Sequence, residues 1–134
     1  MRRVHLIVGL LGVVIFVLTG QLMARHVPPV HTMVPELRLM YVSRHIYLLG
    51  AALVNLVTGL YLRMAAGGWQ RAMQFGGSVL LLLSPALLTL AFLAESPLGL
   101  SGRSWRSSGG IYARFAGALV HLLSQLKSRP FGRN

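Results

Sequence analysis

The sequence predicts an all-α membrane protein in which a single domain, residues 1–134, forms a four-helix up-down bundle across the bilayer. Of the 134 residues, 54% are hydrophobic and 11% are charged, whereas a soluble domain has about 25% charged residues. Four apolar stretches each approach the roughly 20 residues of helix that cross a bilayer. Short segments rich in Pro, Gly, Ser and Arg separate them, as in an up-down bundle.

The first predicted helix is 4–24, which contains no charged residue. Arg2 and Arg3 precede it, but the apolar stretch is longer than the core of a signal peptide. We therefore expect a spanning helix. The second is 37–63, where an apolar run is extended toward its N-terminus by a segment of helical character.

The third predicted helix is 71–94, and Pro85 lies inside it. Proline has no backbone N–H, so it frees a carbonyl that must find a partner within the bundle. The fourth predicted helix is 110–127. Arg114 lies in its first turns, from which an arginine side chain reaches the membrane surface.

The positive charges favour an inner-membrane protein with both termini in the cytoplasm. Arg2 and Arg3 directly precede the first helix, and Lys and Arg concentrate on the cytoplasmic side. The net charge of +11 is distributed between the apolar stretches, which favours anionic lipid headgroups rather than nucleic acid as the partner.

The composition excludes several classes of enzyme. The sequence contains no Asp and no Cys, and its only acids are Glu36 and Glu95. Paired-carboxylate catalysis, an Asp-oriented triad, carboxylate-held Mg²⁺ and thiolate chemistry all lack their residues. No acid lies inside a predicted helix of the kind that proton-coupled cation exporters use. We expect no catalytic site.

A basic and aromatic collar lies at the start of the second predicted helix. Tyr and Arg at this level anchor a helix in the headgroup region, and the alternative is a docking surface for an acidic partner or a quinone head. The residues of the collar are Arg38, Tyr41, Arg44 and Tyr47.

Small and polar residues recur at helical spacing on one face of each helix. Because lipid is as apolar as leucine, such residues mark the faces that pack together. The main hypothesis is therefore a non-catalytic accessory, assembly or scaffolding subunit that packs against other membrane subunits or itself. The predicted packing residues are Gly9, Gly12, Asn55, Gly59, Gly77, Ala113 and Gly117.

The five histidines divide into two layers in this topology. His5 and His121 lie toward the cytoplasmic side, and His26, His31 and His45 lie toward the other. Imidazoles at one depth on facing helices provide the two axial ligands of a b-type haem. The geometry permits the pairs His5 with His121 and His26 with His45. The structural alternative is hydrogen bonding between helices.

These residues resemble the bacterial cytochrome b561 group of four-helix membrane haem proteins. The likeness comprises His5 followed by Thr19-Gly20, His45 with Gly50, and His121. It implies haem ligation by His5, His45 and His121 and electron transfer from a membrane quinol. The second helix-four histidine of the two-haem members is missing here, and His26 would replace it from a loop.

The first loop gathers thioether and imidazole groups, which suit copper. Their spacing is irregular, and residues of these types are common at membrane surfaces, so we predict no metal site. The residues are Met23, His26, His31, Met33 and Met40.

Overall fold

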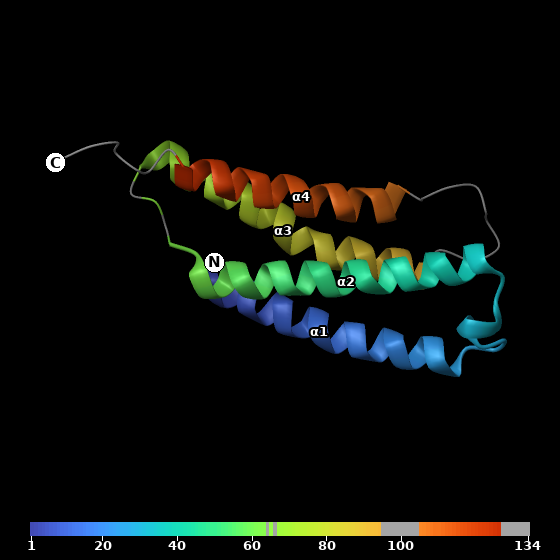
Figure 1. Ribbon diagram of the computed structural model, residues 1–134. Helices are drawn as coiled ribbons and strands as arrows, with labels where there is room; N and C mark the ends of the chain where they lie inside the picture. The colour runs from blue at the N-terminus through green and yellow to red at the C-terminus, as the bar shows by residue number, and fades with distance from the viewer. Residues whose placement is uncertain (64, 66, 95–104, 127–134) are drawn as a thin grey trace.

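A computed structural model describes residues 1–63, 65, 67–94 and 105–126, and all its regular elements are helical. The predictions of an all-α fold and of four helices are confirmed (Figure 1). The elements in order are α1 (Arg2–Arg25), the short 3-10 helix η1 (Val30–Thr32), α2 (Pro35–Tyr61), α3 (Gly68–Ala94) and α4 (Trp105–Leu126).

Three helices, α1, α2 and α3, are long and apolar enough to cross a membrane by length and composition. Among the described residues, α4 is not in this set. It has 22 residues, but Arg106, Arg114 and three serines dilute its apolar character. Of the four predicted spanning helices, three therefore meet this criterion within the described residues.

The structure moves every predicted helix boundary except the end of α3 at Ala94, and it moves the start of α4 the most. This helix begins at Trp105 rather than 110, through a Ser- and Gly-rich segment predicted as loop. Packing overrides the poor helix propensity of these residues. Ser107 is buried, and the hydroxyl of Ser84 on α3 donates to the carbonyl of Gly110 at 2.7 Å.

The other boundaries that move shift by one to three residues. α2 begins at Pro35, because proline suits the first helical position, where its missing N–H is not needed. α1 begins at Arg2, whose guanidinium donates to the carbonyls of Gly59 and Leu60 near the end of α2, at 3.3 and 3.0 Å. Such contacts satisfy carbonyls that a helix end leaves free.

α1 and α2 form a closely packed antiparallel pair. A Cβ added to Gly9 would lie 2.8 Å from the backbone nitrogen of Leu56, and one added to Gly12 would lie 2.8 Å from the Cβ of Ala52. Gly59 lies against Leu6 in the same way. The partner's number falls as the glycine's number rises, which makes the pair antiparallel.

α3 and α4 form a second antiparallel pair of the same kind. Gly77 and Gly117 lie against each other, since a Cβ added to either would lie within 3.0 Å of the carbonyl oxygen of the other. Gly110 lies against Leu88. Helix backbones approach this closely only where the contact residues are small.

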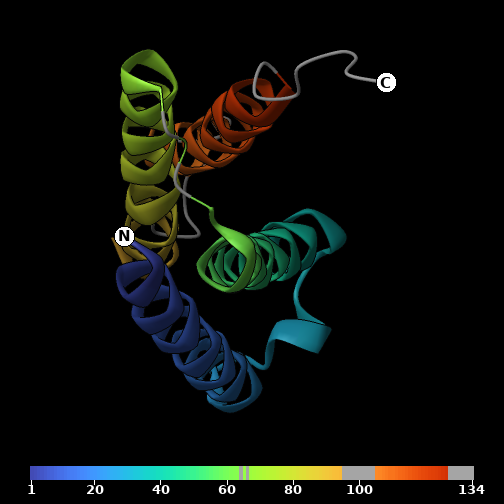
Figure 2. The same cartoon turned by 90° about the vertical axis from the view of Figure 1, so that its left-hand side faces the viewer.

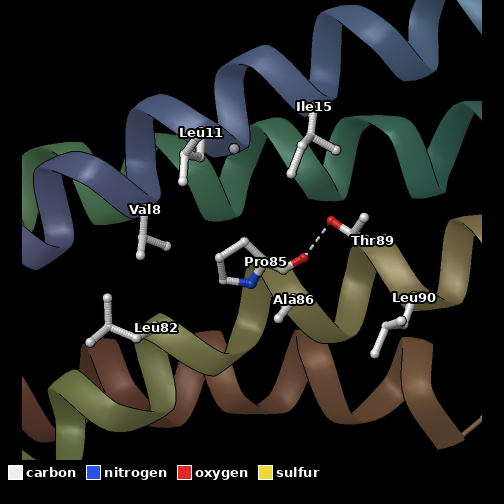
Figure 3. A pocket seen from close by; sticks show the side chains of 9 residues that line it. Val8, Leu11, Ile15, Leu82, Pro85, Ala86, Thr89 and Leu90 are labelled. Carbon is white, nitrogen blue, oxygen red and sulfur yellow. Dashed lines mark hydrogen bonds between the residues drawn. The ribbon is translucent and has the colours of Figure 1, made fainter.

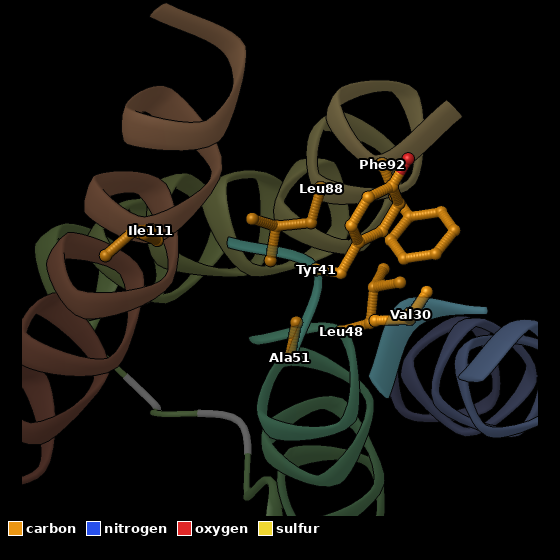
Figure 4. Packing of buried hydrophobic residues seen from close by; sticks show 7 residues of the cluster. All are labelled: Val30, Tyr41, Leu48, Ala51, Leu88, Phe92 and Ile111. Atoms are coloured by element: carbon orange, nitrogen blue, oxygen red, sulfur yellow. The ribbon is translucent and has the colours of Figure 1, made fainter. Parts of the chain in front are cut away.

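The two pairs meet where α2 packs against α3, and α1 and α4 lie on opposite sides of the molecule (Figures 1 and 2). A buried apolar cluster joins the pairs (Figure 4). The side chain of Gln74 on α3 also bonds to the carbonyl of Arg63 and the amide of Ala65. The cluster comprises Val30, Tyr41, Leu48, Ala51, Leu88, Phe92 and Ile111.

A groove of about 430 Å³ separates α1 from α3. Its walls are almost entirely apolar, and Figure 3 shows Val8, Leu11 and Ile15 of α1 opposite Leu82 and Pro85 of α3. The hydroxyl of Thr89 donates to the carbonyl of Pro85, so this polar group is already satisfied. The groove thus suits a hydrocarbon surface.

Candidate functional site

Buried polar side chains from all four helices are linked near the N-terminal end of α1. His5 comes from α1, Asn55 from α2, Ser78 from α3 and His121 from α4. The first three are at most 1% exposed, and His121 is half-buried. A buried polar side chain is costly unless it is hydrogen-bonded, so the contacts of each determine what the site is able to do.

Asn55 supplies the partner that Pro85 requires. Leu81 lies four residues before Pro85, so its carbonyl has no N–H to accept within α3. The side-chain nitrogen of Asn55 donates to this carbonyl at 2.9 Å. The prediction that the freed carbonyl finds a partner in the bundle is confirmed, and α3 continues as helix through Pro85.

His5 has one satisfied and one unsatisfied ring nitrogen. Its Nδ1 is hydrogen-bonded to Oδ1 of Asn55 at 2.8 Å. Its Nε2 is buried and has no hydrogen-bond partner within the described part of the chain. An unpaired nitrogen at a fully buried residue requires an explanation, because native structures contain few of them.

His121 is the second imidazole of the site. Its ring centroid lies 6.4 Å from that of His5, and the ring planes are 77° apart. Its Nε2 lies 3.1 Å from the hydroxyl oxygen of Ser78. The structure therefore brings together the first of the two histidine pairs that the sequence permits.

The histidines of the second permitted pair, His26 and His45, each contact other residues. His45 stacks on Phe16 of α1 with ring centroids 3.9 Å apart, and its Nδ1 lies 3.1 Å from the hydroxyl of Thr19. His26 lies against Tyr41, with its Nε2 3.4 Å from the phenol oxygen. Each ring is thus engaged with a neighbour other than the predicted one.

The resemblance placed Thr19-Gly20 with His5 and placed His45 with Gly50, whereas in the structure Thr19 and Gly20 meet His45. A Cβ added to Gly20 would lie 3.2 Å from Cε1 and 3.4 Å from Nε2 of His45. The ring of His45 therefore occupies the space beside Gly20, at the contact between α1 and α2. Gly50 lies elsewhere, against the guanidinium of Arg114 on α4.

The collar is only partly at the surface. Arg38 is exposed and Tyr47 is half-buried, but Tyr41 and Arg44 are only 9% and 7% exposed. Tyr41 packs edge-on against Phe92 inside the apolar cluster. The interpretation of Tyr41 and Arg44 as lipid-facing anchors is therefore corrected: they belong to the interior.

The small-residue faces are used mainly for contacts between helices of this chain. The five predicted packing glycines all lie at the contacts between α1 and α2 or between α3 and α4, and Ala113 is half-buried. They are therefore not free to pack against another subunit. The sequence argument for an accessory role rested on these faces. In the structure they instead form the contacts between α1 and α2 and between α3 and α4.

The thioethers of the first loop serve packing, since Met23 and Met33 lie against the apolar cluster. Among the described residues, no group of three or more His, Cys, Asp or Glu side chains is placed to hold a metal ion. Glu95 lies outside the described residues.

One contributor to the site, Ser78, was missed by sequence reasoning. Ser78 contacts His121 across 43 residues of sequence, and only its position beside Gly77 on the packed face of α3 hinted at this. Arg114, which the sequence predicts to reach the membrane surface, lies over Gly50 with its guanidinium 4.8 Å from the ring centroid of Phe115.

No family model, curated protein or solved structure matches this chain, so the site itself has to indicate the function.

Proposed function

We propose that this chain is an integral inner-membrane protein, a four-helix up-down bundle with cytoplasmic termini, that holds one b-type haem between His5 and His121. The observation that carries the proposal is the buried Nε2 of His5, which has no hydrogen-bond partner among the described residues and lies beside a second imidazole. The haem supplies a one-electron couple when bound, and the protein then carries electrons in the membrane.

The spacing of the rings supports this ligand pair. His5 and His121 would hold the haem from facing helices, so their rings have to lie near each other. The observed separation is 6.4 Å. Ligation through Nε2 of His121 would replace its contact with Ser78. Neither His26 nor His45 is needed in this proposal.

The test is a reduced-minus-oxidised visible spectrum of the protein purified in mild detergent, with haem quantified per chain. We expect a sharp α band and close to one haem per chain. His5→Ala and His121→Ala remove the band, whereas His31→Ala, a change at an exposed residue of η1, retains it. A colourless folded protein, or full absorbance in His121→Ala, overturns the proposal.

A second function, that of an accessory subunit of a membrane complex, is favoured by the open side of the bundle. Only 17% of the apolar window of α1 is buried, and the groove between α1 and α3 lies beside it. This apolar groove is a better docking place for a helix of another subunit, or for a second copy of this chain, than the small-residue faces are. Those faces are already occupied by contacts within the chain.

Photo-crosslinking in native membranes tests this role. A photoreactive residue at Leu11 or Leu90 lies in the groove, and one at Val57 is the matched control; these side chains are 55%, 53% and 55% exposed. We expect one discrete protein adduct from the groove positions and none from Val57. Equal labelling at all three, or lipid adducts alone, contradicts the accessory role.

A further inference from the structure

The orientation of the Asn55 amide is fixed by its own contacts. Its nitrogen donates to the carbonyls of Ala51 and Leu81, at 3.0 and 2.9 Å. Carbonyl oxygens only accept hydrogen bonds. Reversing the amide would place its oxygen against both of them, so the orientation follows from the hydrogen-bond network. The amide oxygen must therefore face His5.

This orientation determines which nitrogen of His5 carries the proton. The amide oxygen of Asn55 only accepts, so Nδ1 of His5 donates to it across 2.8 Å. In a neutral imidazole, one nitrogen is a donor and the other an acceptor. The lone pair of His5 is therefore on Nε2, the buried nitrogen that has no partner among the described residues.

Pro85 leaves the carbonyl of Leu81 free to accept a hydrogen bond from Asn55. In a regular helix the carbonyl of Leu81 would accept from the N–H of residue 85, but proline has none. The freed carbonyl then binds the amide of Asn55 from the neighbouring helix. Pro85, Leu81, Asn55 and His5 thus form one chain of contacts from α3 through α2 to α1.

We infer that Asn55 is a positioning residue that holds His5 as the Nδ1–H tautomer and so presents the Nε2 lone pair to a metal-containing ligand. The identity of that ligand rests on the proposed function, but the tautomer does not. Metal-binding histidines commonly donate their other N–H to an oxygen acceptor, which fixes the tautomer and the ring orientation. Asn55 supplies this acceptor without placing a charge in the interior.

The first test measures the tautomer itself, by ¹⁵N NMR of histidine-labelled protein prepared without haem. We expect His5 to be almost entirely the Nδ1–H tautomer. Asn55→Ala shifts it toward the Nε2–H form. Thr58→Val, which removes a hydroxyl that donates to the carbonyl of Val54 within α2, leaves the His5 signals unchanged. An Nε2–H tautomer in the unaltered protein, or no change in Asn55→Ala, overturns the inference.

Pro85→Ala gives a second test that alters neither Asn55 nor His5. It returns an intrahelical N–H to the carbonyl of Leu81, so the amide of Asn55 is held less firmly. We expect a mixture of His5 tautomers between those of the unaltered protein and Asn55→Ala. A tautomer population identical to that of the unaltered protein contradicts the role of Pro85.

The haem-loaded protein separates this inference from the proposed function. If haem binds, Asn55→Ala shifts the midpoint potential, while Thr58→Val does not. An unshifted potential overturns the positioning role even though haem is bound. If no haem binds but the tautomer shifts as expected, the proposed function fails and the role of Asn55 is upheld.

Discussion

The side-chain nitrogen of Asn55 lies 2.9 Å from the carbonyl oxygen of Leu81, the carbonyl that Pro85 deprives of its intrahelical donor. In a membrane interior no water replaces a lost donor, so a proline is tolerated where a neighbouring helix supplies one. The same amide orients His5, which links the backbone of α3 to the imidazole of α1.

We expect Asn55→Ala, which removes the amide, and Pro85→Ala, which restores the backbone donor, to have coupled effects on the free energy of unfolding. Asn55→Ala leaves the carbonyl of Leu81 unsatisfied and lowers the free energy of unfolding by about 1–3 kcal/mol. In a Pro85→Ala background the carbonyl has its own N–H, so Asn55→Ala costs at least about 0.5 kcal/mol less. Reversible unfolding of the four proteins in mixed micelles measures both values. Strictly additive costs contradict the link.

Substitution by alanine is expected to change the stability of the protein in opposite directions at two adjacent glycines of α3, Gly76 and Gly77. A Cβ at Gly76 meets nothing within 4 Å, so Gly76→Ala stabilises the helix by up to about 1 kcal/mol. A Cβ at Gly77 meets the carbonyl of Gly117 at 3.0 Å, so Gly77→Ala destabilises the pair by about 1–3 kcal/mol. Thermal unfolding in detergent distinguishes them, and a shift of equal sign would refute the packing.

A larger side chain at Gly117 is expected to separate α3 from α4. Its Cβ would lie 2.8 Å from the carbonyl of Gly77 and 2.9 Å from Cγ of Leu81. Gly117→Leu therefore lowers the unfolding temperature and broadens the elution profile in mild detergent. Ala118→Leu adds a side chain of the same kind at the neighbouring exposed position and serves as the control. Equal behaviour of the two variants contradicts this contact.

An alanine is expected to lower the unfolding temperature by different amounts at Gly9 and at Gly50, because the neighbouring atoms differ in their freedom to move. A Cβ at Gly9 would lie 2.8 Å from the backbone nitrogen of Leu56, which is fixed in α2. At Gly50 the neighbour is the tip of the Arg114 side chain, which is able to move aside. Gly9→Ala therefore lowers the unfolding temperature more than Gly50→Ala, and the reverse order would show that Arg114 is held rigidly.

The helices were predictable because apolar length and proline position are local properties of the sequence. The partner of the Leu81 carbonyl was predictable only in kind: Pro85 requires a donor, and nothing in the sequence selects Asn55. Likewise, the start of α4 at Trp105 depends on the contact of Ser84 with the Gly110 carbonyl, a tertiary interaction that outweighs local propensity.

The histidine pairs show the same limit. Sequence spacing placed His5 and His121 in one layer, and the structure brings them together. The same reasoning paired His26 with His45, but Phe16 and Tyr41 engage those rings instead. Depth along a helix follows from residue number, whereas rotation about the axis and competition from aromatic neighbours do not. Tyr41 and Arg44 are buried for the same reason.

The glycine contacts of α1 with α2 lie wholly within the N-terminal half of the chain, and those of α3 with α4 lie wholly within the other. During synthesis, every residue of the first pair therefore leaves the ribosome before α3 begins. The proline-containing helix comes later, and its free carbonyl meets an Asn55 that is already in place. The carbonyl of Leu81 is therefore synthesised after Asn55, the side chain that supplies its donor.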